Sequence, residues 1–101
     1  MPHTLLIIGA GIEACEGLKT ARSMGLHLIV ADGDAKAPGL KFADHRLIVS
    51  TYDGEALARA ALQLRSDGIP IDGVIAMCAD VPLSAAKVAQ ALGLRGLSEQ
   101  S

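Results

Sequence analysis

Four short runs of apolar residues recur along the chain, separated by stretches in which polar residues dominate. The runs are rich in Ile, Val and Leu, and runs of this length are typical of strands that are buried on both faces of a sheet. The predicted strands are Leu5 to Ile8, Leu26 to Ala31, Arg46 to Ser50, and Gly73 to Met77.

Three of the segments outside these runs carry apolar residues at the three- and four-residue spacing of an amphipathic helix. The first predicted helix spans Ile12 to Met24, the second begins with Asp53 as its N-cap and ends before Gly68, and the third runs from about Asp80 to Gly93. Asp is a favoured N-cap and Gly a favoured residue just after a helix, so these ends agree with the spacing. The residues expected to face the core are Ala14, Cys15, Leu18 and Ala21, then Leu57, Ala60, Ala61 and Leu64, and finally Ala85, Val88, Ala89 and Leu92.

The alternation of strands and helices predicts the fold class. Strands joined by helices form right-handed crossovers, which give an α/β fold with a parallel sheet and helices on both faces. We expect three layers and a Rossmann-like half with four to five parallel strands, ordered 3-2-1-4. In this order the winding direction changes between the first and fourth strands, and a crevice opens beyond their carboxyl ends. The loops lining it are Gly9 to Glu13 and Cys78 to Pro82.

The loop after the first predicted strand begins Gly9-Ala10-Gly11. Such a turn presents backbone N–H groups and a helix N-terminus, which favour anionic ligands, and we expect it to need a positive φ at Gly11. The loop also fits the Gly-x-Gly-x-x-Gly/Ala fingerprint of dinucleotide-binding domains, and Asp32 follows Gly11 by about 20 residues, where a ribose-binding acid is expected. NAD binding is therefore one hypothesis. The other is a purely local role, with the glycines serving the turn, Asp32 and Asp34 the loop, Glu13 the helix dipole and Asp80 an N-cap.

Composition and charge exclude several classes of function. The chain has 101 residues, which suits one domain, and we predict a single domain over residues 1–101. Its only aromatic residues are Phe42 and Tyr52, so base stacking is not available as a main binding mode. The formal net charge is −2 and the basic residues are scattered, which gives no electrostatic footprint for nucleic acid or for an anionic membrane.

Targeting, metal-binding and catalytic patterns are also missing from the sequence. The first residues lack a signal-peptide pattern and no apolar run approaches the ~20 residues that cross a bilayer, so we expect a cytoplasmic protein. Cys15 and Cys78 lack Cys-x-x-Cys or His-rich spacing, which favours buried thiols over a disulfide framework or a metal site. Neither the Gly-x-Ser-x-Gly elbow of hydrolases nor the P-loop lysine pattern is present, so we assign no catalytic residue.

Two longer segments carry a recognisable series of motifs. Residues 31–53 read ADGDAKAPGLKFADHRLIVSTYD, and residues 72–98 read DGVIAMCADVPLSAAKVAQALGLRGLS. With the glycine loop, the motifs in order are Gly9 to Gly11, Asp32 to Asp34, Ala37 to Gly39, Ala43-Asp44, Tyr52-Asp53, Asp80, and Val88 to Leu94. In this order and spacing they resemble the N-terminal domain of ATP-grasp ligases, the pre-ATP-grasp or biotin carboxylase N-terminal-like domain of carbamoyl-phosphate synthetase, biotin carboxylase and amino-acid ligases.

The resemblance implies a domain that binds substrate and does not catalyse alone. In the family this domain helps to bind the carboxylate or amine substrate and packs on the remaining ATP-grasp domains, while ATP and magnesium bind between two later domains. The chain is then expected to be part of a longer ligase that forms an acyl phosphate and passes it to an amine or thiol, and to hold no cofactor itself. The substrate-binding residues are expected to be Gly9, Ala10, Gly11, Ile12, Glu13, Asp32, Cys78 and Asp80.

One expectation follows for the chain taken alone. A domain separated from its neighbours exposes apolar surface, so we expect self-association, for example as a homodimer.

Two other interpretations stay open beside the ligase domain: a NAD(P)-binding Rossmann domain of an oxidoreductase, and a small ligand-sensing or protein-interaction module.

Overall fold

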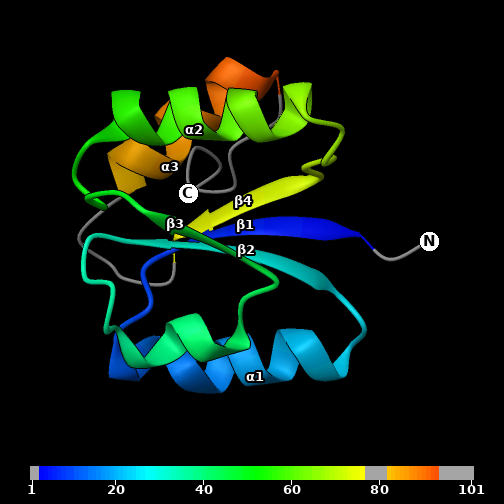
Figure 1. Cartoon of the computed structure of the whole chain (residues 1–101), viewed down its shortest axis with the longest axis vertical. Helices are drawn as coiled ribbons and strands as arrows, with labels where there is room; N and C mark the ends of the chain where they lie inside the picture. The colour runs from blue at the N-terminus through cyan, green and yellow to red at the C-terminus, as the bar shows by residue number, and fades with distance from the viewer. Residues whose placement is uncertain (1–2, 77–81, 94–101) are drawn as a thin grey trace.

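A parallel sheet of four strands forms the middle layer of the structure, a computed structural model that describes residues 3–76 and 82–93 (Figure 1). All neighbouring strands pair in parallel, and the order is β3-β2-β1-β4, which confirms the predicted sheet. The strands are β1 (Thr4–Ile8), β2 (His27–Asp32), β3 (His45–Ile48) and β4 (Gly73–Ala76).

Helices cover both faces of the sheet, which confirms the three-layer α/β fold. In Figure 1 the layer below the sheet holds the 3-10 helices η1 (Ile12–Ala14) and η2 (Pro38–Phe42) with the helix α1 (Cys15–Ser23). The layer above it holds α2 (Gly54–Ser66) and α3 (Pro82–Leu92), which pack side by side.

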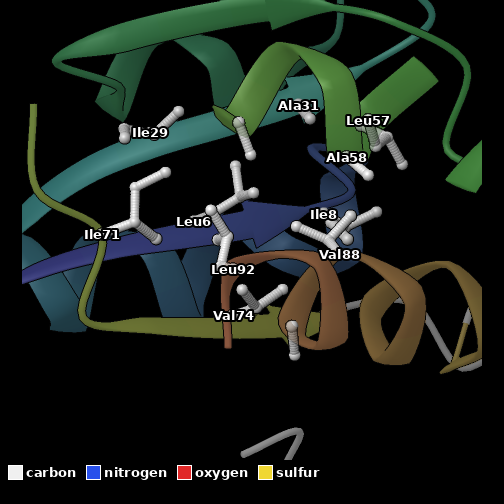
Figure 2. Close-up of a cluster of buried hydrophobic side chains, with 12 residues drawn as sticks. Leu6, Ile8, Ile29, Ala31, Leu57, Ala58, Ile71, Val74, Val88 and Leu92 are labelled. Atoms are coloured by element: carbon white, nitrogen blue, oxygen red, sulfur yellow. The ribbon is translucent and has the colours of Figure 1, made fainter. Parts of the chain in front are cut away.

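Alternating strand residues divide the core into two clusters because successive side chains point to opposite faces of a sheet. Leu6 and Ile8 of β1 face α2 and α3, where they meet Leu57 and Val88 (Figure 2). Ile7 lies between them in sequence and faces α1, and all three of these β1 side chains are fully buried. The second cluster contains Ile7, Ala10, Ala14, Leu18, Ala21, Leu28, Val30, Ala37 and Leu40.

The predicted helix faces agree with the structure in most positions. In α1 and the turn before it, Ala14, Leu18 and Ala21 are buried, but Cys15 is half-buried, so the prediction of a buried thiol is only partly met. In α2 the buried residues are Leu57, Ala58 and Ala61, while Ala60 and Leu64 are half-buried. In α3 the buried residues are Val88, Ala89 and Leu92, and the side chain of Ala85 lies outside the described residues.

Helix ends follow the predicted capping residues. The Asp53 side chain accepts a hydrogen bond from the Ala56 N–H at 3.0 Å, as expected of an N-cap. Gly25, Gly68 and Gly93 have φ values of +83°, +93° and +74°, the left-handed conformation in which glycine ends helices. The predicted start of the third helix near Asp80 lies outside the described residues.

Two predicted elements differ from the structure. The helix expected from Ile12 begins as a 3-10 turn, in which the Ala14 N–H donates to the Gly11 carbonyl at 2.9 Å, and becomes α-helical only at Cys15. The third strand begins at His45 and ends at Ile48, and burial on both faces is wrong for it, since Arg46 and Ile48 are exposed. β3 is an edge strand. Leu47 packs against the core cluster beneath α2 and α3, whereas Arg46 and Ile48 point to the opposite face and are exposed there. In the described part of the chain no helix could span a membrane.

Candidate functional site

The glycine loop leaves the carboxyl end of β1 and enters η1. Its positive φ, +107°, is at Gly9, whereas Gly11 is extended with φ −66° and ψ 174°. The expectation of a positive φ at Gly11 is therefore wrong, and Gly9 is the position where the backbone favours glycine. The Gly9 N–H donates to the Ala31 carbonyl at 2.8 Å, which carries the pairing of β1 with β2 one residue into the loop.

The carboxylate of Asp32, at the end of β2, binds the backbone of two loops. Its Oδ2 accepts a hydrogen bond from the Ala10 N–H at 2.8 Å, and its Oδ1 accepts one from the Asp34 N–H at 2.9 Å. Asp32 thus joins the glycine loop to the loop after β2. This is a different use of the carboxylate from the ribose contact that the dinucleotide fingerprint predicts.

The Ala-Pro-Gly motif packs directly against the glycine loop. The Gly39 N–H donates to the Ala10 carbonyl at 2.7 Å. A Cβ atom on Gly39 would lie 2.7 Å from Leu18 Cδ1 and 2.8 Å from the Ala10 carbonyl oxygen, so the position has no room for a side chain. This contact was not predicted, although Pro38-Gly39 between two apolar residues is a signal of a tight backbone approach.

Apart from Asp32, the predicted site residues fall into three groups: buried, exposed, and outside the described residues. Gly9 and Ala10 are buried, and both polar backbone groups of Ala10 are bonded inside the domain. Gly11 is half-exposed and Ile12 is 79% exposed, so these residues form the outer surface of the loop. The side chain of Glu13 and the whole of Cys78 and Asp80 lie outside the described residues.

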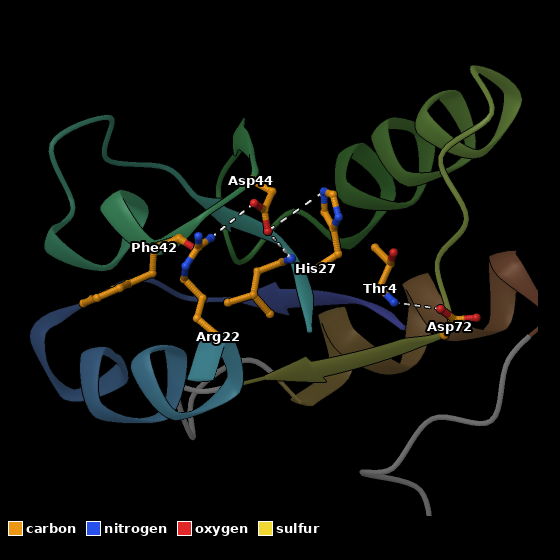
Figure 3. Close-up of polar contacts among 7 residues, drawn as sticks. Thr4, Arg22, His27, Phe42, Asp44 and Asp72 are labelled. Carbon is orange, nitrogen blue, oxygen red and sulfur yellow. Dashed lines mark hydrogen bonds and ion pairs between the residues drawn. The ribbon is translucent and has the colours of Figure 1, made fainter. Parts of the chain in front are cut away.

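A second set of polar contacts lies at the amino edge of the sheet, opposite the glycine loop (Figure 3). Asp44 Oδ2 accepts a hydrogen bond from the Leu28 N–H at 2.8 Å, Asp44 Oδ1 lies 3.2 Å from Arg22, and His27 Nε2 lies 3.9 Å from Asp44 Oδ2. Partial burial disfavours the carboxylate, but the Leu28 and Arg22 hydrogen bonds and the charges of His27 and Arg22 outweigh it and lower the pKa of Asp44 below 3.8. His45 stacks on His27 with ring centroids 5.7 Å apart.

A shallow hollow of about 340 Å³ lies between α2 and α3. Its walls contain none of the predicted site residues, and the Lys87–Glu55 pair at its rim, with 3.6 Å between Lys87 Nζ and Glu55 Oε1, is largely exposed. Within residues 3–76 and 82–93, no group of three or more His, Cys, Asp or Glu side chains could hold a metal ion.

The chain is similar to proteins of one family. The family model of the ATP-grasp N-terminal domain matches residues 18–96. The formate-dependent phosphoribosylglycinamide formyltransferase of Synechococcus elongatus is 31% identical over 67 residues, which are 66% of this chain and 17% of that protein. The protein of the same name from Erythrobacter litoralis is 34% identical over 59 residues, 56% of this chain and 15% of that one.

Solved structures show the same fold. Phosphoribosylglycinamide synthetase from Anaerococcus prevotii superposes with a TM-score of 0.79 and 26% identity over 95% of this chain and 24% of that one. The L-amino acid ligase from Bacillus licheniformis gives a TM-score of 0.75 and 25% identity over 94% of this chain and 24% of that one. The chain thus spans a quarter or less of the length of these relatives. Because the family match covers most of the sequence and the sheet order agrees with it, the chain belongs to the ATP-grasp N-terminal domain family.

Proposed function

We propose that residues 1–101 are the substrate-side domain of a longer ATP-dependent ligase. In this proposal the whole enzyme joins a carboxylate to an amine or thiol through an acyl phosphate, and this domain alone does not catalyse. The family membership and the names of the relatives, a synthetase, an L-amino acid ligase and a formate-dependent transferase, support the proposal. Formate and amino acids are both carboxylates, which is why we name that substrate class.

The observation that carries the proposal is the glycine loop at the carboxyl edge of the sheet. In α/β folds, ligands bind in the crevice beyond the carboxyl ends of the strands, where the sheet order changes direction. β1 and β4 are the two strands at this change, and the loop from Gly9 to η1 starts there. The proposed substrate-binding residues remain Gly9, Ala10, Gly11, Ile12, Glu13, Asp32, Cys78 and Asp80, with Gly11 and Ile12 as the exposed part of the loop.

ATP and magnesium belong to the proposed parent enzyme rather than to this domain. The resemblance assigns both to two later domains, which the present sequence does not include. The remaining ATP-grasp domains are then the partner of this domain within one chain. We further propose that the chain self-associates when it is studied alone, for example as a homodimer, because a domain separated from its neighbours exposes apolar surface.

A substitution at Gly11 in the full-length enzyme tests the proposal. Its φ of −66° is open to any residue, so Gly11→Val adds a side chain at the loop without backbone strain. We expect kcat/KM to fall by at least about tenfold, equivalent to roughly 1.4 kcal/mol of transition-state binding, while the domain stays folded. Leu18→Ala is the matched control, since it removes a buried side chain of the same layer at about 2–5 kcal/mol of stability. Unchanged kcat/KM in Gly11→Val would overturn the proposed site.

A further inference from the structure

We propose that Asp32 is a positioning residue that sets the conformation of the glycine loop for substrate binding, an inference that rests on the proposed function. Asp32 acts on the loop through the Ala10 backbone, with no contact to substrate required. This positioning role is additional to the substrate contact proposed above and does not depend on it.

The Asp32 carboxylate accepts one backbone hydrogen bond on each oxygen. One oxygen accepts from Ala10 N–H at 2.8 Å and the other from Asp34 N–H at 2.9 Å. Ala10 is fully buried, so its N–H has no water to replace Asp32 as a partner. Hydrogen bonds to a charged acceptor are stronger than neutral ones, and they hold the two loops at a fixed distance.

Ala10 is held on both sides by the same stretch of chain, residues 32–39. Its N–H is bound by Asp32 and its carbonyl accepts the Gly39 N–H at 2.7 Å. The chain between these two residues also carries the Asp34 and Ala37 turn, in which the Ala37 N–H donates to the Asp34 carbonyl at 3.0 Å. Residues 32–39 therefore hold the glycine loop through hydrogen bonds to both polar backbone groups of Ala10, so a displacement of one segment is coupled to the other.

The hydrogen bonds at Ala10 affect substrate binding through the loop residues that follow Ala10. Gly11 follows Ala10 directly and leads in an extended conformation into Ile12, so a displacement of the Ala10 backbone would also displace these two residues, the exposed part of the loop. A loop that is already ordered loses less entropy when a ligand binds. Without the Asp32 carboxylate, the buried Ala10 N–H lacks its acceptor, and the loop has to rearrange before it can bind substrate.

The test combines a spectroscopic measurement on the 101-residue chain with substrate binding by the full-length ligase. Asp32→Ala removes both acceptor oxygens, while Asp32→Asn keeps one. Asp34→Asn is the matched control, because the Asp34 side chain accepts from Lys36 N–H and not from the glycine loop. In ¹H–¹⁵N spectra, the Ala10 amide proton should move upfield in Asp32→Ala and keep its position in Asp34→Asn. The amides of Leu57 and Val88, in the opposite layer, report whether each variant is folded.

In the full-length ligase, we expect substrate to bind about ten- to a hundredfold more weakly in Asp32→Ala, with the loss expressed in KM more than in kcat. Asp32→Asn should recover part of this loss and Asp34→Asn should bind as the wild type does. An unmoved Ala10 amide in Asp32→Ala overturns the inference. So does a moved amide with substrate binding equal to that of Asp34→Asn, in an enzyme that Gly11→Val still impairs. If Gly11→Val leaves kcat/KM unchanged, it is the proposed function that fails, whatever Asp32 does.

Discussion

Asp44 and Leu28 exchange two hydrogen bonds across the amino ends of β3 and β2. The Leu28 N–H donates to Asp44 Oδ2 at 2.8 Å, and the Asp44 N–H donates to the Leu28 carbonyl at 2.8 Å. The same arrangement joins β4 to β1, where Asp72 Oδ2 accepts from the Thr4 N–H at 2.7 Å and the Asp72 N–H donates to the Thr4 carbonyl at 2.8 Å (Figure 3). Each edge strand is thus preceded by an aspartate that fixes its register against the neighbouring strand.

Removal of the Asp44 side chain should destabilise the domain through its backbone partner. Leu28 is fully buried, so Asp44→Ala leaves an N–H without an acceptor, and we expect a loss of about 1–3 kcal/mol in the free energy of unfolding. Urea denaturation measures the loss. Arg22→Ala is the control: it removes the ion pair with Asp44 and an exposed hydrogen bond to the Phe42 carbonyl, from an arginine that is 46% exposed, and it should cost less than about 1 kcal/mol. Equal losses in the two variants would show that the ion pair, and not the Leu28 bond, is what matters.

The same aspartate predicts a pH dependence with a defined sign. The pKa of Asp44 is lowered in the folded state, so its carboxylate stabilises the fold at pH values above the unfolded-state value of 3.8. This contribution is lost as the pH falls through the lower, folded-state pKa. The difference in unfolding free energy between wild type and Asp44→Asn should therefore be constant near neutral pH and shrink below pH 3.8. A difference that does not change with pH contradicts this prediction.

Gly39 should be intolerant of any side chain. In Gly39→Ala the new Cβ would lie 2.8 Å from the Ala10 carbonyl oxygen, which is backbone and cannot turn aside. We expect a loss of about 1–3 kcal/mol in thermal or urea unfolding, in the range of overpacked cores. Gly73→Ala is the control, because its Cβ would meet only the end of the Leu5 side chain at 3.1 Å, and its effect should stay within about 0.5 kcal/mol. Equal losses at both positions would contradict the close approach at Gly39.

The sequence predicts those parts of the fold that depend on local patterns. Apolar runs and helical spacing place the four strands and the helices α1 and α2 within a few residues, whereas they do not predict the 3-10 helix η2. Asp53 and Gly93 mark helix ends through local backbone chemistry. The alternation of strands and helices then restricts the sheet to parallel pairing with right-handed connections. The exposure of β3 was missed because a run of apolar residues does not show whether its strand lies in the centre or at the edge.

The contacts that define the candidate site were not predictable in the same way. Asp32 fits the ribose position of a dinucleotide fingerprint, and only the three-dimensional approach of the loop shows that its carboxylate binds Ala10 N–H, 22 positions earlier in the chain. The Asp72 carboxylate accepts a hydrogen bond from the Thr4 N–H, 68 positions earlier, and no periodic pattern in the sequence indicates this contact. Side-chain to backbone bonds over such separations depend on the packed fold, so one sequence by itself does not reveal them.

The surroundings of Asp32 and the family match both bear on the dinucleotide-binding alternative. In a dinucleotide-binding domain, the acid after the second strand accepts hydrogen bonds from the ribose hydroxyls. Here both oxygens of the Asp32 carboxylate already accept backbone N–H groups, from Ala10 and Asp34. Each carboxylate oxygen has a further lone pair, so these bonds do not by themselves exclude a ribose, and it is the family match over residues 18–96 that favours the ligase domain.

We therefore expect the 101-residue chain to bind neither NADH nor ATP in isothermal titration calorimetry at ligand concentrations up to about 1 mM, a limit that corresponds to roughly −4 kcal/mol of binding free energy. For NADH the reason is the membership of the ATP-grasp N-terminal domain family, and for ATP it is the proposed location of the nucleotide site in other domains of the parent enzyme. The full-length ligase is the positive control and should bind ATP in the same buffer with magnesium. A micromolar dissociation constant for NADH would favour an oxidoreductase domain, and one for ATP would place a nucleotide site on this domain itself.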